Sequence, residues 1–205
     1  MSSAIVIGNG ESRRKVDISQ FQKTYTLIGC NAIHRDHKVE HLICCDRRMA
    51  EEAINNPQSS ETNIYVRDDW WRYYFKIRKH KKTKTLPNLF YQGERKQDQP
   101  LHWGSGCYAV LVAVDLGFKD VKLLGFDLYP SYSQKVNNIY KGTENYSKKD
   151  SQGVDYSFWV YQLAKIFNHF KDHNFTIIND EGWEMPSSWR SKKNVQFENI
   201  SQYIS

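Results

Sequence analysis

Short runs of consecutive apolar residues recur through this chain, separated by polar or helix-like stretches. They occupy residues 4–7, 25–30, 41–45, 63–66, 89–91, 121–124 and 175–178. Because apolar residues fill successive positions and do not alternate with polar ones, strands formed from these runs must be covered on both faces. Such strands, alternating with helices, form a mostly parallel, doubly wound sheet. The pattern therefore predicts an α/β fold with one Rossmann-like sheet and helices on both faces.

Two helices stand out between these strands. Residues 106–116 (GCYAVLVAVDL) are apolar on almost every side, which indicates a helix buried over most of its surface. Ser105 is its expected N-cap and Gly117 its expected C-terminal stop. Residues 156–170 gather aromatic and aliphatic side chains on one broad stripe, which indicates a second helix packed on the sheet.

Residues 1–205 are expected to form one domain. The length and a hydrophobic share of 40% suffice for one sizeable core, and no linker or internal repeat divides the chain. Residues 130–153 are polar and rich in Ser, Asn, Lys and Tyr. A long irregular segment in a compact domain is commonly functional, so we expect a lid or binding loop here and call these residues the lid segment.

The cysteines and the absence of targeting signals predict a cytoplasmic protein. Four cysteines without CxxC spacing favour free thiols in a reducing compartment. The first residues lack a signal-peptide pattern, and no apolar run approaches the roughly 18 residues that cross a bilayer. No transmembrane segment is therefore expected. The aromatic share of 14% leaves self-association into a homo-oligomer open.

The formal net charge is +6, and residues 76–84 form the clearest cationic run. Such a run is typical of a solvated loop or helix face, and it can also steer an anionic partner. No helix-turn-helix, zinc-finger or RNA-recognition signature accompanies it, so no nucleic-acid partner is expected.

The first predicted strand runs directly into Gly8-Asn9-Gly10. In a doubly wound sheet, ligands bind outside the carboxyl ends of the strands. Glycine lets the backbone approach a phosphate or sugar closely, and the following helix can offer free N–H groups to an anion. A nicotinamide-dinucleotide site is disfavoured, because Arg13 replaces the third glycine and Asn31, not an acid, follows the second strand. A Walker-type phosphate loop is absent as well.

Polar side chains follow three of the predicted strands. Asn9, Asn31 and Asp46 each come at or just after a strand end, so they are expected to gather on one rim of the sheet. Two amides and a carboxylate suit the hydroxyls of a ribose and the edge of a base. Asn and Asp are also ordinary residues at strand ends and turns, and this plainer interpretation stays open.

These blocks resemble the bacterial sialyltransferases of glycosyltransferase family 42. GNGES at residues 8–12 resembles the family's GNGPS, and Cys30-Asn31 matches its Cys-Asn after the second strand. The longest match is GSGCYAVLVAVDLGFKDVKLLGFDLY at residues 104–129. The same blocks occur in the related DUF115 or motility-associated-factor proteins. The resemblance covers about the first two-thirds of the chain.

The resemblance implies a single Rossmann-like domain with a small lid. It implies metal-independent transfer, with inversion, of a nonulosonic (sialic-type) acid from a CMP-activated donor to a glycan acceptor, without a cofactor. Asp46 falls where the family has Asn. The residues expected to bind the nucleotide-sugar donor or shape its site are Gly8, Asn9, Gly10, Ser12, Asn31, Asp46, Ser105, Gly106, Gly125 and Asp127.

Catalytic residues are carried over less completely. Tyr129 matches the family tyrosine that hydrogen-bonds the departing phosphate, which would stabilise charge that develops in the transition state. Tyr132 is the nearest counterpart of a second family tyrosine. The family's general base is a lid histidine, but the lid segment here has none. His102 is a candidate base, with a structural imidazole as the plainer alternative, and Asp150 and Asp155 are further candidates.

Two other functions remain open. One is a pterin or nucleotide diphosphotransferase like the DUF115 branch, which would use Asp46 and Asp127 as Mg²⁺ ligands. The other is a non-catalytic nucleotide- or glycan-binding protein on the same scaffold, suggested by the missing lid histidine.

Overall fold

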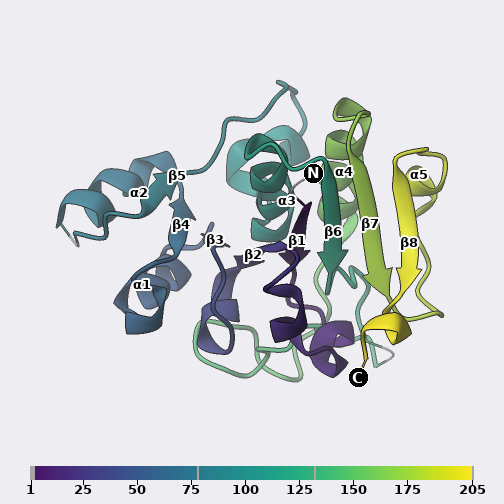
Figure 1. Cartoon of the computed structure of the whole chain (residues 1–205), viewed down its shortest axis with the longest axis horizontal. Helices are drawn as coiled ribbons and strands as arrows, with labels where there is room; N and C mark the ends of the chain where they lie inside the picture. Colours follow the sequence, from purple (N-terminus) through teal and green to yellow (C-terminus); the bar gives the residue numbers. More distant parts are fainter. Residues whose placement is uncertain (1–2, 78, 132, 205) are drawn as a thin grey trace.

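A computed structural model describes residues 3–77, 79–131 and 133–204 of the chain. The described residues form one eight-stranded sheet in which every neighbouring pair of strands is parallel, in the order β5-β4-β3-β2-β1-β6-β7-β8 (Figure 1). The strands are β1 Ser3–Ile7, β2 Thr26–Cys30, β3 His41–Ile43, β4 Asn63–Val66, β5 Thr83–Thr85, β6 Asp120–Leu124, β7 Asn174–Asn179 and β8 Val195–Asn199. The predicted α/β class is confirmed.

The chain starts in the middle of the sheet and builds it outward in two directions. From β1 it adds β2 to β5 on one side, then returns to add β6 to β8 on the other, so β5 and β8 are the two edges (Figure 1). The order of the strands reverses at β1, between β2 and β6. A doubly wound sheet has its ligand crevice at such a reversal point, outside the carboxyl ends of the strands.

Helices cover both faces of the sheet, as the apolar runs predict. The helices are α1 Arg47–Asn55, α2 Asp68–Arg72, α3 Ser105–Asp115, α4 Ser157–His169 and α5 Ser187–Arg190. Val6 and Ile28 belong to the core beneath α3 and α4, whereas their neighbours Ile5 and Leu27 belong to the core on the α1 face. All four side chains are fully buried. Burial on both faces explains why these strands are apolar at successive positions.

The apolar helix predicted at residues 106–116 is α3, and its start differs from the prediction. Gly104 is the N-cap and makes no side-chain cap, so Ser105 is the first helical residue and not the cap. The hydroxyl of Ser105 bonds to Asn31 instead. Gly117 has φ +89° and ends the helix as predicted.

Both edge strands differ from the prediction. The run 89–91 forms no strand, because Phe90 turns into an aromatic cluster with Trp103 and Phe170, and Thr83–Thr85 takes the edge position. The other edge, β8, lies in a C-terminal tail for which no strand was predicted. The tail packs back onto the domain, since Trp189 is fully buried and its indole donates to the carbonyl of Val160.

The described residues of the lid segment are irregular, with one isolated antiparallel bridge among them, between Lys135 and Gln152. In Figure 1 it forms the green loop beneath the ends of β2 and β3. The amide of Ile139 donates to the carbonyl of Asn9 at 2.8 Å, and Asn137 accepts from the amide of Glu11 at 2.9 Å. These bonds tie the segment to the turn that follows β1.

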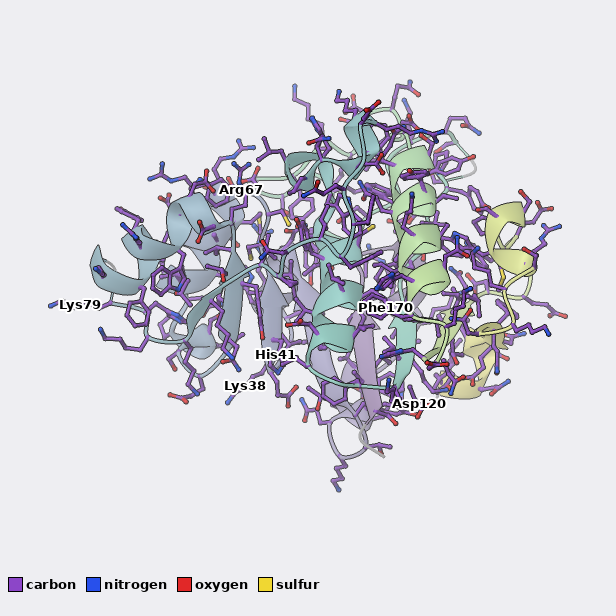
Figure 2. The ribbon with its side chains drawn as sticks, turned by 90° about the horizontal axis from the view of Figure 1, so that it is seen from above. Lys38, His41, Arg67, Lys79, Asp120 and Phe170 are labelled. Atoms are coloured by element: carbon purple, nitrogen blue, oxygen red, sulfur yellow. The ribbon has the colours of Figure 1, made fainter. Side chains whose placement is uncertain are left out.

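The cationic run lies at one end of the sheet. Figure 2 shows Lys79 at the outer edge of the molecule, and its side chain is exposed. Among the residues that the structure describes, no helix has the length and apolar character needed to cross a membrane.

Candidate nucleotide-sugar site

A cavity of about 390 Å³ opens at the carboxyl ends of β1, β2, β3 and β6, against the start of α3. The predicted site residues that line it are Gly8, Asn9, Gly10, Asn31, Asp46, Ser105, Gly106, Gly125 and Asp127. They come from five separate stretches of the chain. The structure thus brings most of the predicted donor-binding residues to one place, at the reversal point of the sheet.

The glycines after β1 are needed because two strand exits pack against each other. The amide of Gly8 donates to the carbonyl of Leu124 at 2.8 Å, and that of Gly10 to the carbonyl of Gly125 at 2.9 Å. A Cβ atom added to Gly8 would lie 2.5 Å from the carbonyl oxygen of Gly125, and one added to Gly10 would lie 2.3 Å from Cγ of Asp127. No larger residue fits at either position without moving the loop after β6.

Four amides of this turn bond within the protein and are not available to an anion, contrary to expectation. The amides of Gly8 and Gly10 donate to the carbonyls of Leu124 and Gly125. The amide of Glu11 donates to Asn137, and the amide of Ser12 donates to Oδ2 of Asp127 at 2.9 Å. The short 3₁₀ turn Glu11–Lys15 follows, not a long helix. The glycine turn therefore shapes the cavity and supplies Asn9, while the N–H groups of Gly8, Gly10, Glu11 and Ser12 bond within the protein.

Asp127 holds the turn in place from the β6 side. Its carboxylate accepts from both the amide and the hydroxyl of Ser12, and its side chain is buried. Burial raises the pKa of Asp127, and the two hydrogen bonds from Ser12 oppose that shift. Ser12 is buried and does not line the cavity, so its contact is with Asp127.

Asn9 joins the exits of β1 and β2 to the lid segment. Its Nδ2 group donates to the carbonyl of Cys30 at 3.0 Å and to the hydroxyl of Tyr146 at 3.2 Å. Its Oδ1 atom accepts from Arg13 at 3.4 Å. Tyr146 thereby connects the lid segment directly to the predicted site.

Asn31 and Ser105 form a polar bridge across the cavity. Asn31 has φ +53°, a left-handed conformation that Asn tolerates. Its Oδ1 atom accepts from the hydroxyl of Ser105 at 3.0 Å, and that hydroxyl accepts from the amide of Cys45 at 3.2 Å. The bridge fixes the start of α3 against the exits of β2 and β3, and it leaves the Nδ2 group of Asn31 available to a ligand.

The start of α3 is the part of the cavity best suited to an anion. Ser105, Gly106 and Cys107 form its first turn, and all three line the cavity. The N–H groups of a first turn have no partner within the helix, and Gly104 provides no side-chain cap. With the helix dipole they favour a negative group such as a phosphate. Gly106 carries no side chain to block the approach.

Asp46 lines the cavity at the start of α1. Its Oδ1 atom accepts from the amides of Arg48 at 2.8 Å and Met49 at 3.4 Å, which makes it the N-cap of that helix. Asp46 thus has a structural role after the strand end, as the plainer interpretation of these residues allowed, and it also lines the cavity.

One wall of the cavity is apolar and was not predicted. It is formed by Trp103, Phe126, Leu128, Trp159 and Leu163. The sequence signal that could have revealed this wall is the position of Trp103, directly before Gly104 and Ser105. Cys30 and Cys45 also line the cavity. Burial raises the pKa of Cys30 to about 12 and that of Cys45 to about 11, so both thiols are neutral.

Two of the predicted catalytic residues, Tyr129 and His102, do not line the cavity. The hydroxyl of Tyr129 donates to the carbonyl of Glu184 at 2.7 Å, and its ring packs edge-on against Tyr156. Burial raises the pKa of Tyr129. His102 is exposed on the short turn before α3, where its carbonyl accepts from Gln162. Tyr132 lies outside the described residues.

Fold and cavity together describe an α/β domain with an all-parallel sheet and a cavity at the carboxyl ends of its central strands. No protein-family model and no curated protein matches the sequence. Among solved structures, the chain is similar to the sialyltransferase CstII from Campylobacter jejuni in complex with cytidine-5'-monophosphate, with a TM-score of 0.51 and 15% identity over 86% of this chain and 79% of that one. A CstII complex with CMP-3FNeuAc gives a TM-score of 0.50 and 18% identity over 86% and 81%. At this identity the similarity establishes the fold.

Proposed function

We propose that this protein is a small, metal-independent glycosyltransferase that transfers a nonulosonic acid from a CMP-activated donor to a glycan acceptor. The observation that carries the proposal is the cavity at the sheet's reversal point, where the uncapped start of α3 meets Asn31 and Asp46. The similarity to structures of a sialyltransferase with bound CMP and CMP-3FNeuAc supports the same conclusion.

Each part of the cavity suits one part of a cytidine monophosphate ester. The first turn of α3 would receive the phosphate, because its N–H groups are free and its dipole favours negative charge. The Nδ2 group of Asn31 would bind a ribose hydroxyl or the edge of the base. The apolar wall around Trp103 and Phe126 would cover a pyrimidine ring. A volume of about 390 Å³ lies within the usual range for small-molecule sites.

The departing CMP gains negative charge on its phosphate as the bond to the sugar breaks. Tyr129 would stabilise that charge only after its hydroxyl exchanges the carbonyl of Glu184 for a phosphate oxygen. Donor binding and a local rearrangement of residues 180–186 would therefore occur together.

Thermal denaturation with CMP, CDP, UMP and NAD tests the proposal. At a ligand concentration about 100 times Kd, binding to the folded state adds roughly 2.7 kcal/mol, which raises Tm by roughly 5–10 °C for a chain of this size. We expect the largest shift with CMP. No shift with CMP, or equal shifts with all four ligands, would contradict a cytidine site.

A non-catalytic nucleotide-binding protein is the second candidate, and the contact of Tyr129 with Glu184 favours it. Cleavage of CMP-sialic acid by the wild-type protein would separate the two. No observation favours the diphosphotransferase hypothesis: both carboxylate oxygens of Asp127, one of its two candidate Mg²⁺ ligands, already accept from Ser12.

A further inference from the structure

The proposed transfer leaves additional negative charge on the phosphate of CMP. The hydroxyl of Tyr129 is bonded to the carbonyl of Glu184, so it meets this charge only after a rearrangement. Two tryptophans line the cavity, Trp103 and Trp159. The indole nitrogen of Trp103 is buried, whereas the side chain of Trp159 is partly exposed. Trp159 is therefore the tryptophan of this cavity whose N–H group a ligand can reach.

Trp159 lies beside the first turn of α3. A Cβ atom added to Gly104 would lie 2.8 Å from the indole nitrogen of Trp159 and 3.0 Å from its Cδ1 atom. The carbonyl of Trp159 lies 4.0 Å from Sγ of Cys107, and the amide of Gly104 donates to Gln162, further along α4, at 3.3 Å. These contacts place the indole nitrogen at the start of α3, where the phosphate is proposed to bind.

The glycine at position 104 is explained by this indole. Gly104 has φ −72° and ψ 149°, a backbone conformation that any residue adopts. A side chain here would meet the indole of Trp159, so glycine is needed for the room that the ring takes. The N-cap of α3 thus carries no side chain, and the indole nitrogen occupies the space beside it.

The indole N–H of Trp159 has no hydrogen-bond partner among the described residues. By contrast, the indoles of Trp71, Trp183 and Trp189 each donate to a backbone carbonyl at 2.9 to 3.0 Å. An indole N–H donates and does not accept, so its partner in the cavity must be an acceptor. A phosphate oxygen beside the first turn of α3 is such an acceptor.

We propose that the indole N–H of Trp159 donates a hydrogen bond to the phosphate of the CMP-activated donor, an inference that rests on the proposed function. The acceptor oxygen bonds to the anomeric carbon as the bond from that carbon to the phosphate oxygen breaks. Both electrons of the broken bond stay on CMP, and the acceptor's proton passes to solvent. Because the phosphate gains charge in this step, the hydrogen bond is stronger in the transition state than with the intact donor.

The binding test compares CMP with cytidine, which lacks the phosphate. Trp159→Phe keeps an aromatic ring and removes the N–H group. We expect its affinity for CMP to fall about tenfold or more, as for a lost hydrogen bond to a charged group, and its affinity for cytidine to stay within about threefold of wild type. Trp70→Phe is the matched control, since Trp70 lies on α2, outside the cavity lining, and should leave both affinities unchanged.

Hydrolysis of CMP-sialic acid, with water as the acceptor, gives a kinetic readout. Trp159→Phe is expected to lower kcat about 100-fold, the usual cost of removing one donor to a charge that develops in the transition state. A third readout uses the wild-type protein alone. The indole N–H resonance that is missing from the NMR spectrum of Trp159→Phe should shift downfield when the wild type binds CMP, and not when it binds cytidine.

The inference is overturned if Trp159→Phe weakens cytidine binding as much as CMP binding, or if either its CMP affinity or its kcat stays within about threefold of wild type. It is also overturned if the wild type binds CMP while the Trp159 resonance does not respond, a result that leaves the cytidine site in place. If the wild type does not bind CMP at all, the proposed function fails as well.

Discussion

Replacing Gly8 by alanine is expected to lower the free energy of unfolding by at least about 3 kcal/mol. The new Cβ would lie 2.5 Å from the carbonyl oxygen of Gly125 and 3.2 Å from the ring of Phe126. Gly125 has little freedom to retreat, because it has φ +72° and its carbonyl accepts from Gly10. For a chain of this size, we expect Tm to fall by roughly 6–12 °C, measurable by thermal or urea denaturation.

Gly182→Ala is the control for this substitution. A Cβ at Gly182 meets no atom within 4 Å, and the residue is exposed. We expect a change within about 0.5 kcal/mol, or a slight stabilisation through the unfolded state. Equal effects at the two glycines would show that the exits of β1 and β6 are not packed as described.

A negative charge at the start of α3 is expected to weaken CMP binding at least tenfold. Ser105→Asp places a carboxylate on the first residue of the helix, where it repels a bound phosphate. The favourable interaction with the helix dipole, about 0.3–1 kcal/mol, is offset by the loss of the hydroxyl that bonds Asn31, so no gain in stability is expected. Isothermal titration with CMP at low salt measures the affinity, and urea denaturation measures the stability.

Ser105→Asn separates charge from shape, because Asn has the size of Asp without its charge. We expect Ser105→Asn to bind CMP within about threefold of wild type, with the difference between the two variants shrinking at high salt. If both variants bind CMP equally well, the phosphate does not lie at the start of α3.

The central strands could be predicted from the sequence, and the edge strands could not. β1, β2, β6 and β7 bury both faces, so their apolar runs are continuous and stand out. An edge strand has less to bury: β5 is the polar tripeptide Thr83–Thr85, and β8, Val195–Asn199, has no fully buried side chain. The apolar run at 89–91 was misleading because Phe90 is drawn into an aromatic cluster and not into the sheet.

The site could be predicted as a set of strand ends but not as a set of contacts. Parallel strands bring their carboxyl ends to one edge, which is why Asn9, Asn31 and Asp46 were expected to lie together. Local sequence does not reveal which groups are already satisfied by distant partners. The hydroxyl of Ser105 goes to Asn31, 74 residues away, and that of Tyr129 goes to Glu184, 55 residues away.

A crystal of the wild-type protein soaked with CMP tests the central claim most directly. We expect electron density in the cavity, with phosphate oxygens within hydrogen-bond distance of the Ser105 and Gly106 amides and the cytosine against Trp103 and Phe126. An empty cavity at saturating CMP would contradict the proposed site. Nucleotide bound elsewhere, for example against the cationic run at residues 76–84, would contradict it equally.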